Sequence, residues 1–530
     1  MKTKKILTSL LLAAATTANA GGILTNTNQS IDFLRNPARD AAIGLDGVYS
    51  NPAGVVFMPE GFHLGLNWQY AHQTRTITST DQVFALGLKN NKNTTKTFEG
   101  VADAPIIPSI QAAWNKGDWS MQLNFSVPGG GGKCTYDNGL GSFERVVGTI
   151  AGTFMSMDQL ANALNAYSPL IYQMAGRQAP TGVISLNNTH GYDMNSFMEG
   201  RQYYFGLQLG TAYKLNEKVS VYGGLRLLYG DATYRARISN INVYQADGSF
   251  VDFASKLKEV GVQSMELAQR ASEVLPILNN VPENMMTPEM QQLKAGLTQL
   301  TSDESKRSMA ALAQYSQGVN LMCNQTGLGV APVIGIDYRL NDKFNFAAKY
   351  EFKTQMRMKN ESTLFEAGEI EAVNKFRDGE KVNEDQPALL TLGAQYSPIE
   401  AVRLNLGAHY FFDKQADWYG ASQKKLDHNS YELLAGAEWD INDRVTISAG
   451  GQITRYGNTD EYINDMSFVV NSYSIGFGMN YRLSEVVKLK AAFFQTEYGN
   501  YDRTDYPLAG MNDSFTRTNR VLGIGCDITL

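Results

Sequence analysis

The chain has 530 residues and is sparsely charged, with Asp, Glu, Lys and Arg at 18% against about 25% in an average soluble domain. Its net charge of −6 argues against a nucleic-acid partner, which needs a basic face. A hydrophobic content of 43% excludes a disordered or collagen-like chain. No internal stretch approaches the ~20 consecutive apolar residues of a spanning helix. Several soluble domains or one very large β structure remain.

Residues 1–20 predict a secretory signal peptide. A basic start is followed by a short apolar run at 6–15 and by the small-x-small cleavage pattern Ala18-Asn19-Ala20. Loss of this segment removes the three lysines of the basic start and takes the formal charge from −6 to −9. The protein is therefore expected to be exported.

Apolar and polar residues then alternate with period two, most clearly from about residue 200 onward. In 402–410, for example, Leu404 and Leu406 alternate with Arg403 and Asn405. Strict alternation of this length is typical of a strand with one apolar and one polar face. The pattern predicts about fourteen strands, which begin near residues 62, 105, 119, 201, 219, 327, 344, 388, 402, 431, 445, 472, 487 and 519.

The predicted strands are joined alternately by tight turns and by long segments such as 128–200, 239–326 and 355–387. This asymmetry is typical of an outer-membrane barrel, with turns on the periplasmic side and loops outside. The strand that enters each tight turn ends in an aromatic residue suited to a membrane–water interface, namely Trp114, Tyr213, Tyr338, Tyr396, Trp439 and Tyr481. We therefore predict an all-β transmembrane barrel. The alternative is a soluble β-sandwich.

Two segments between the strands have helical periodicity, 154–178 and 250–320. In the second, apolar residues recur near helical spacing at Leu257, Val260, Leu267, Ala271, Val274 and Leu278. An extracellular helix of this kind could shield the barrel mouth, dock a partner or present an apolar groove.

Motifs for metal, cofactor or catalytic chemistry are missing from the sequence. Cys134, Cys323 and Cys526 lack metal-ligand spacing, and one disulfide among them is possible. The five histidines are scattered, and no Gly-x-Ser-x-Gly elbow occurs. We therefore expect no metal, no cofactor, no catalytic residue and no enzyme activity.

The segment before the first strand, residues 21–58, is too rich in apolar residues, Gly and Ala for a solvated tail. It contains Asn36-Pro37-Ala38-Arg39 and then Asn51-Pro52-Ala53-Gly54. An Ala/Gly-rich stretch that leads into Asn-Pro-Ala-Gly just before a barrel resembles the long-chain fatty-acid transporter family (FadL/TodX-type outer-membrane proteins). The resemblance implies a 14-stranded barrel over 59–530, a small N-terminal hatch in the lumen and outer loops that capture hydrophobic ligands.

Three groups of site residues follow from this resemblance. The hatch residues are Asn51, Pro52, Ala53, Gly54 and Phe57. In the family a lateral opening forms where the third strand kinks. The third strand predicted here, 119–127, runs into Pro128, Gly129 and Gly130, which cannot hold a regular ladder; an ordinary loop start is the alternative. Ligand capture is assigned to the helical insertion at Leu257, Val260, Leu267, Val274 and Leu278.

The sequence thus predicts a monomeric multi-pass β-barrel of a Gram-negative outer membrane that takes up hydrophobic molecules. Its expected partners are membrane lipid and a hydrophobic ligand, either a long-chain fatty acid or an aromatic hydrocarbon. The alternative is a family-related outer-membrane protein with a role in surface assembly or secretion.

Overall fold

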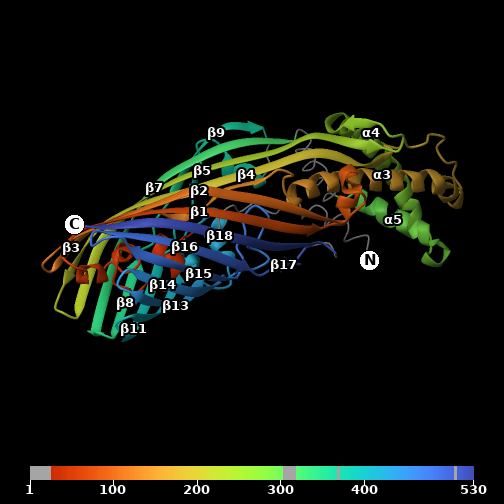
Figure 1. Cartoon of the computed structure of the whole chain (residues 1–530). Coiled ribbons are helices and arrows are strands. Elements are labelled where there is room, and N and C mark those ends of the chain that lie inside the picture. The colour runs from red at the N-terminus through yellow and green to blue at the C-terminus, as the bar shows by residue number, and fades with distance from the viewer. Residues whose placement is uncertain (1–24, 303–317, 367–370, 507–509) are drawn as a thin grey trace.

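A closed antiparallel barrel forms the body of the computed structural model, which describes residues 25–302, 318–366, 371–506 and 510–530 (Figure 1). Strand β1 pairs with both β2 and β18, so the sheet has no free edge. Around the wall the fourteen strands are β1 (Gly61–Thr80), β2 (Thr95–Lys116), β3 (Trp119–Tyr136), β4 (Thr189–Lys214), β5 (Val219–Gln245), β7 (Val319–Asn341), β8 (Phe344–Glu351), β11 (Leu389–Ile399), β12 (Val402–Phe411), β13 (Tyr431–Asn442), β14 (Val445–Arg455), β15 (Ser472–Arg482), β16 (Val487–Tyr498) and β18 (Asn512–Thr529).

The predicted barrel and all fourteen of its strands are confirmed, but several strands are longer than predicted. Strand β2 begins at Thr95 instead of near 105, and β4 begins at Thr189 instead of near 201. Strand β3 continues through the glycine run to Tyr136 instead of ending at 127. These extensions lie toward the long loops, where the outer face no longer has to be apolar, so the alternation that identifies a strand fades there.

The wall has the two faces that the alternation predicts. Outward side chains are apolar and exposed, as at Leu209 (52%) and Leu406 (62%). The aromatic residues beside the tight turns are exposed too, as at Trp114 and Trp439. Inward side chains are polar and buried, as at Gln122.

Helices and short strands occupy the long connections. Four strands lie outside the barrel order, namely β6 (Phe250–Asp252), β9 (Arg357–Glu366), β10 (Lys381–Asn383) and β17 (Tyr501–Arg503). The α-helices are α2 (Ile31–Arg35), α3 (Gly141–Met174), α4 (Phe253–Asn280) and α5 (Pro288–Leu300). The 3-10 helices are η2 (Leu45–Val48), η3 (Gly54–Phe57), η4 (Gln82–Leu86), η5 (Leu88–Asn90), η6 (Glu283–Met285), η8 (Glu371–Phe376), η9 (Asp413–Gln415) and η10 (Tyr419–Lys425).

The helices α3, α4 and α5 lie together at one end of the barrel, and the C terminus lies at the other end (Figure 1). The helical prediction is confirmed for both insertions, although α3 starts earlier than 154 and α4 is separated from α5 by η6. Residues 303–317 of the second insertion lie outside the described residues. Across the described part of the chain, no helix is long and apolar enough to cross a membrane.

Candidate functional site

The N-terminal segment 25–58, called the hatch below, lies inside the barrel. It consists of α2, η2 and η3 joined by irregular backbone, whose carbonyl groups need donors from elsewhere. Lumen-facing side chains of β2, β3, β5 and β8 supply them: Ser109 Oγ donates to Gln29 (2.6 Å), Gln122 Nε2 to Pro52 (2.8 Å), Ser220 Oγ to Ala53 (2.6 Å), Asn345 Nδ2 to Ala41 (2.8 Å) and Lys349 Nζ to Tyr49 (2.8 Å). The hatch is therefore bonded to several sides of the wall.

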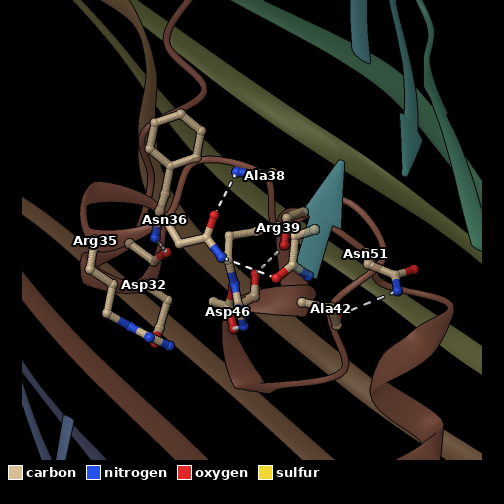
Figure 2. A network of polar contacts seen from close by, with 12 residues as sticks. Asp32, Arg35, Asn36, Ala38, Arg39, Ala42, Asp46 and Asn51 are labelled. Carbon is tan, nitrogen blue, oxygen red and sulfur yellow. Dashed lines mark hydrogen bonds and ion pairs between the residues drawn. The ribbon is translucent and has the colours of Figure 1, made fainter. Parts of the chain in front are cut away.

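Buried ion pairs also fasten the hatch. Figure 2 shows Arg35 beside Asp32 and Arg39 beside Asp46. Both arginines reach the same wall carboxylate, since Arg35 Nη1 lies 2.6 Å and Arg39 Nη1 2.9 Å from Glu438 Oε1. All five side chains are nearly inaccessible to solvent. Charges buried this deeply need partners, and each member here has one or more.

Further ion pairs connect α2 to β16 and β18, next to the barrel closure. Lys490 Nζ lies 2.7 Å from Asp32 Oδ2 and 2.6 Å from Asp527 Oδ1. Lys490 belongs to β16 and Asp527 to β18, whereas Glu438 belongs to β13. Helix α2 is thus ion-paired to both β13 and β16.

The predicted hatch residues 51–57 come together at a second wall contact. Asn51 Nδ2 donates to Asp337 Oδ2 of β7 at 2.6 Å, and Asn51 Oδ1 accepts from the N–H of Gly54 at 3.2 Å. A Cβ on Gly54 would lie 2.4 Å from Asn51 Nδ2, so a side chain there would displace this contact. The ring of Phe57 is within reach of Arg339, whose guanidinium lies 5.1 Å from the ring centroid.

The wall is interrupted between β2 and β3. Their pairing stops at Ile110–Phe125 and resumes only at Val101–Thr135, so residues 102–109 and 126–134 face each other without a ladder. On the other side of β3, the register with β4 shifts on both sides of Gly129. Pro128 has no backbone N–H to donate to a ladder, and Gly130 has φ 105°, a conformation that L residues rarely adopt. The predicted kink residues therefore lie at the break in the sheet.

At this interruption the first residues of the hatch, on the lumen side, make the hydrogen bonds to β3 that β2 does not make. Gln29 Oε1 accepts from the N–H of Val127 at 3.0 Å, and Gln29 Nε2 donates to the carbonyl of Val127 at 3.1 Å. The N–H of Asn26 donates to the carbonyl of Pro128 at 2.9 Å. Since Ser109 of β2 also donates to the Gln29 carbonyl, the Gln29 residue contacts both sides of the interruption.

A cavity of about 420 Å³ lies between the hatch and the long loops. This volume is within the usual range of small-molecule sites. The cavity is lined on the hatch side by Phe33, whose ring centroid lies 5.9 Å from that of Phe494. Its lining also includes Tyr203 and Phe205 of β4. These two residues lie on the outward face of that strand, as Leu207 does. The cavity therefore extends from the lumen to the interrupted stretch of wall.

Two arginines face this cavity side by side. Arg75 of β1 and Arg517 of β18 are direct cross-strand partners, and both belong to the cavity lining. Arg517 Nη2 donates to Gln73 Oε1 at 3.3 Å, and its guanidinium lies 5.3 Å from the ring centroid of Tyr498. Within the described residues no carboxylate lies at ion-pair distance from Arg517. Sequence reasoning missed this pair because the two residues are 442 positions apart and only the barrel closure aligns them.

The predicted ligand-capture residues lie elsewhere, on α4, and most of them are buried in the structure. Val260, Leu267, Val274 and Leu278 have exposed fractions of 0%, and Leu257 is partly buried against the same core. Helix α4 contacts both α3 and α5, so its apolar face already packs against neighbouring helices. Helical periodicity identifies an apolar face, but it does not show whether protein or ligand covers that face.

Helix α3 is fastened to the barrel mouth near its first turn. Arg145 Nη2 lies 2.7 Å from Asp513 Oδ1 of β18, and Arg145 Nε lies 3.2 Å from Asp81 Oδ2. The N–H of Ser142 donates to Asp465 Oδ2 at 2.7 Å. Burial raises the pKa values of the Asp81 and Asp465 carboxyls above their usual range, so these two carboxyls lie in poorly solvated surroundings. The cap of helices is therefore tied to the wall by charge-assisted bonds.

Among the residues that the structure describes, no group of three or more His, Cys, Asp and Glu side chains could hold a metal ion. The three cysteines are free thiols, and Cys134 and Cys323 are buried.

No family model and no curated protein sequence matches the chain. Solved structures do match it in three dimensions. A Pseudomonas aeruginosa FadL homologue has a TM-score of 0.54 at 11% identity, over 97% of this chain and 100% of that one. This chain has the FadL fold. A TodX deltaS2S3 mutant, described as a monoaromatic hydrocarbon channel, has a TM-score of 0.52 at 11% identity, over 95% of this chain and 99% of the TodX chain. At this identity the FadL likeness is one of fold.

Proposed function

We propose that the protein is an outer-membrane channel for the uptake of hydrophobic small molecules, and that long-chain fatty acids are its main substrates. The observation that supports this most is the cavity above the hatch, which extends to the interruption between β2 and β3. A general diffusion pore would have no use for a hatch bonded to its wall. A cavity beside a break in the wall suits a ligand that leaves sideways into the membrane.

In this proposal the ligand enters beneath the cap of α3, α4 and α5 and settles against Phe33 and Phe494. Burial stabilises the bound chain by roughly 0.8 kcal/mol per CH₂, so affinity should rise with chain length. Movement of the hatch segment 25–29 away from Val127 then opens the interruption at Pro128, Gly129 and Gly130. The TodX mutant, described as a monoaromatic hydrocarbon channel, is consistent with a hydrophobic ligand.

The pair Arg75 and Arg517 favours a carboxylate over a plain hydrocarbon. Arg517 has no carboxylate at ion-pair distance among the described residues, and an anionic head group beside it could accept bidentate hydrogen bonds from its guanidinium. An aromatic hydrocarbon offers no such group. We therefore place the fatty-acid head at these arginines and its alkyl chain toward Phe33.

The test compares Arg517→Gln with Arg520→Gln, which removes the same charge from the outward face of the same strand. Binding of labelled fatty acids of increasing length and of toluene is measured on the purified proteins. Loss of one charge-assisted contact should weaken fatty-acid binding about tenfold or more in Arg517→Gln, with toluene unaffected. Arg520→Gln should bind both ligands like the wild type. Equal losses of affinity for fatty acid and toluene in Arg517→Gln would contradict the proposal that Arg517 binds the carboxylate.

Uptake in cells tests the transport proposal itself. A deletion strain that expresses the protein should take up long-chain fatty acids faster than one that expresses an unrelated porin. If neither fatty acids nor aromatic hydrocarbons bind or enter better than with that porin, transport is refuted. A role in surface assembly or secretion then becomes the better hypothesis.

A further inference from the structure

The outer surface of β3, β4 and β5 changes from apolar to cationic within a few residues. On β4 the outward positions run from Leu209 and Leu207 through Tyr203 to Arg201. The cross-strand register places Lys133 of β3 opposite Arg201. On β5 the outward positions continue to Arg235 and Arg237. These four residues, Lys133, Arg201, Arg235 and Arg237, form what we call the basic rim patch.

The height of the patch on the barrel follows from strand geometry. From Tyr213, beside a tight turn, to Arg201 a strand rises about 30 Å, at about 3.3 Å per residue and a tilt of about 40°. The apolar band of such a barrel is about 25 Å tall. The basic rim patch therefore lies just beyond the apolar band on the side of the long loops, where the head groups of the outward leaflet lie.

The patch carries more positive than negative charge. Lys133 Nζ lies 2.9 Å and Arg235 Nη1 3.7 Å from the carboxylate of Glu199, so two cations share one carboxylate. Arg201 Nη2 lies 2.8 Å from Asp231 Oδ2. For Arg237 the described residues provide no ion-pair partner. The remaining positive charge contrasts with the net charge of −6 on the whole chain.

The side chains are also accessible. Lys133, Arg201 and Arg235 have exposed side-chain fractions of 52%, 40% and 48%. Directly below them the rings of Tyr203 and Phe205 lie with their centroids 5.9 Å apart. A cationic surface above an aromatic one matches a ligand with an anionic head and acyl chains, and guanidinium groups bind phosphate bidentately.

We propose that the basic rim patch binds the phosphate-bearing head group of a lipid in the outward leaflet. The phosphates contact Lys133, Arg201, Arg235 and Arg237, and the acyl chains lie against Tyr203 and Phe205. The same two rings line the cavity at the break in the wall, so the bound lipid sits beside the interruption between β2 and β3. This lipid is a resident of the membrane and is distinct from the transported ligand.

The test uses the full-length protein, purified and freed of lipid. Native mass spectrometry measures retention of a diphosphorylated glycolipid of the lipid A type, the same lipid after phosphatase treatment, and a zwitterionic phospholipid. We expect the phosphorylated glycolipid to bind about tenfold more tightly than the dephosphorylated one. Equal binding of the two glycolipids by the wild type would overturn the proposal.

Two double variants localise the site. Arg201→Gln with Arg237→Gln should lose about tenfold in affinity for the phosphorylated lipid. Lys218→Gln with Arg444→Gln removes two charges at the tight-turn end and should bind it like the wild type. Folding is checked by the heat-dependent shift in gel mobility. If the first pair does not fold, Arg237→Gln alone serves, because its removal leaves no carboxylate unpaired among the described residues.

Inorganic phosphate distinguishes the source of the anion. For a lipid site, millimolar phosphate should leave glycolipid binding unchanged, because the acyl chains contribute to affinity. Full displacement by phosphate, or an unchanged affinity in the Arg201→Gln and Arg237→Gln variant, would refute a lipid site on this surface.

Discussion

Replacing Gln29 by leucine is expected to loosen β3 at the break in the wall. The Gln29 side chain makes two hydrogen bonds to Val127, as acceptor at 3.0 Å and as donor at 3.1 Å, and the residue is only 4% exposed. Leucine has a similar volume, so the change leaves little cavity. It removes both bonds to Val127 and also the bond from Gln29 Nε2 to the Asn26 carbonyl. The N–H and carbonyl of Val127 then lose the partner that stands in for a neighbouring strand.

The size of the effect follows from these two bonds. A neutral hydrogen bond contributes about 1 kcal/mol net, and a buried group left without a partner costs about 1–3 kcal/mol. Two bonds give at least about 2 kcal/mol, which corresponds to about a thirtyfold shift toward the locally open state of β3.

Hydrogen exchange measures this local opening directly. Amides of residues 125–127, 129 and 130 in nanodisc-embedded protein should exchange about thirtyfold faster in Gln29→Leu than in the wild type. Gln122→Leu is the matched control, because Gln122 also donates to a hatch carbonyl, but from a stretch of β3 in regular register. Unchanged exchange at 125–130 in Gln29→Leu, or an equal acceleration in Gln122→Leu, would show that Gln29 does not hold the break closed.

Other perturbations test the hatch and the loops. Glu438→Gln removes the carboxylate shared by two buried arginines and should weaken hatch docking by about 3–5 kcal/mol. Single-channel openings in planar bilayers should then appear, whereas Asp440→Asn, at a half-exposed pair, should stay closed. Deleting residues 21–50 should make the barrel conduct small ions, and unchanged conductance would contradict a plug. Burial raises the pKa of Asp413 to about 6. Since the unfolded pKa is lower, the charged form costs stability above about pH 6, and stability is regained as pH falls toward 4. Asp413→Asn should therefore raise the temperature of the gel-mobility shift at pH 8 and change it little at pH 4.

The barrel itself could be predicted from the sequence because its strands lie between two environments, lipid and a polar lumen, which impose a period of two on apolar and polar residues. A strand with lipid outside and a polar lumen inside must alternate, as 402–410 does, and each tight turn beside an aromatic residue sets the register of the next strand. The same physical reason explains why the predicted strands did not include the loop-side ends of β2 and β4. Above the membrane both faces contact water or loops, so the alternation disappears although the ladder continues.

The location of the hatch residues could be anticipated only in part. Asn51 and Gly54 stood out as a motif, and the structure places them at one contact with Asp337. The partners of the hatch could not be found, because they come from strands that lie far away in the sequence, 70 residues for Gln122 and 458 residues for Lys490. The apolar spacing at Val260 and Leu267 was visible, but packing against α3 and α5 decided that this face is buried.

The sequence by itself determined the local properties, namely which residues form strands, which side of each strand is apolar and which segment fits inside the lumen. Only the tertiary structure decided which groups meet across the barrel. Closure between β1 and β18 aligns Arg75 with Arg517. At the break between β2 and β3, the side-chain amide of Gln29 makes the hydrogen bonds to Val127 that a neighbouring strand would otherwise make. Both depend on long-range register, which is fixed by the closed ladder of all fourteen strands and has no signature in any short stretch of chain.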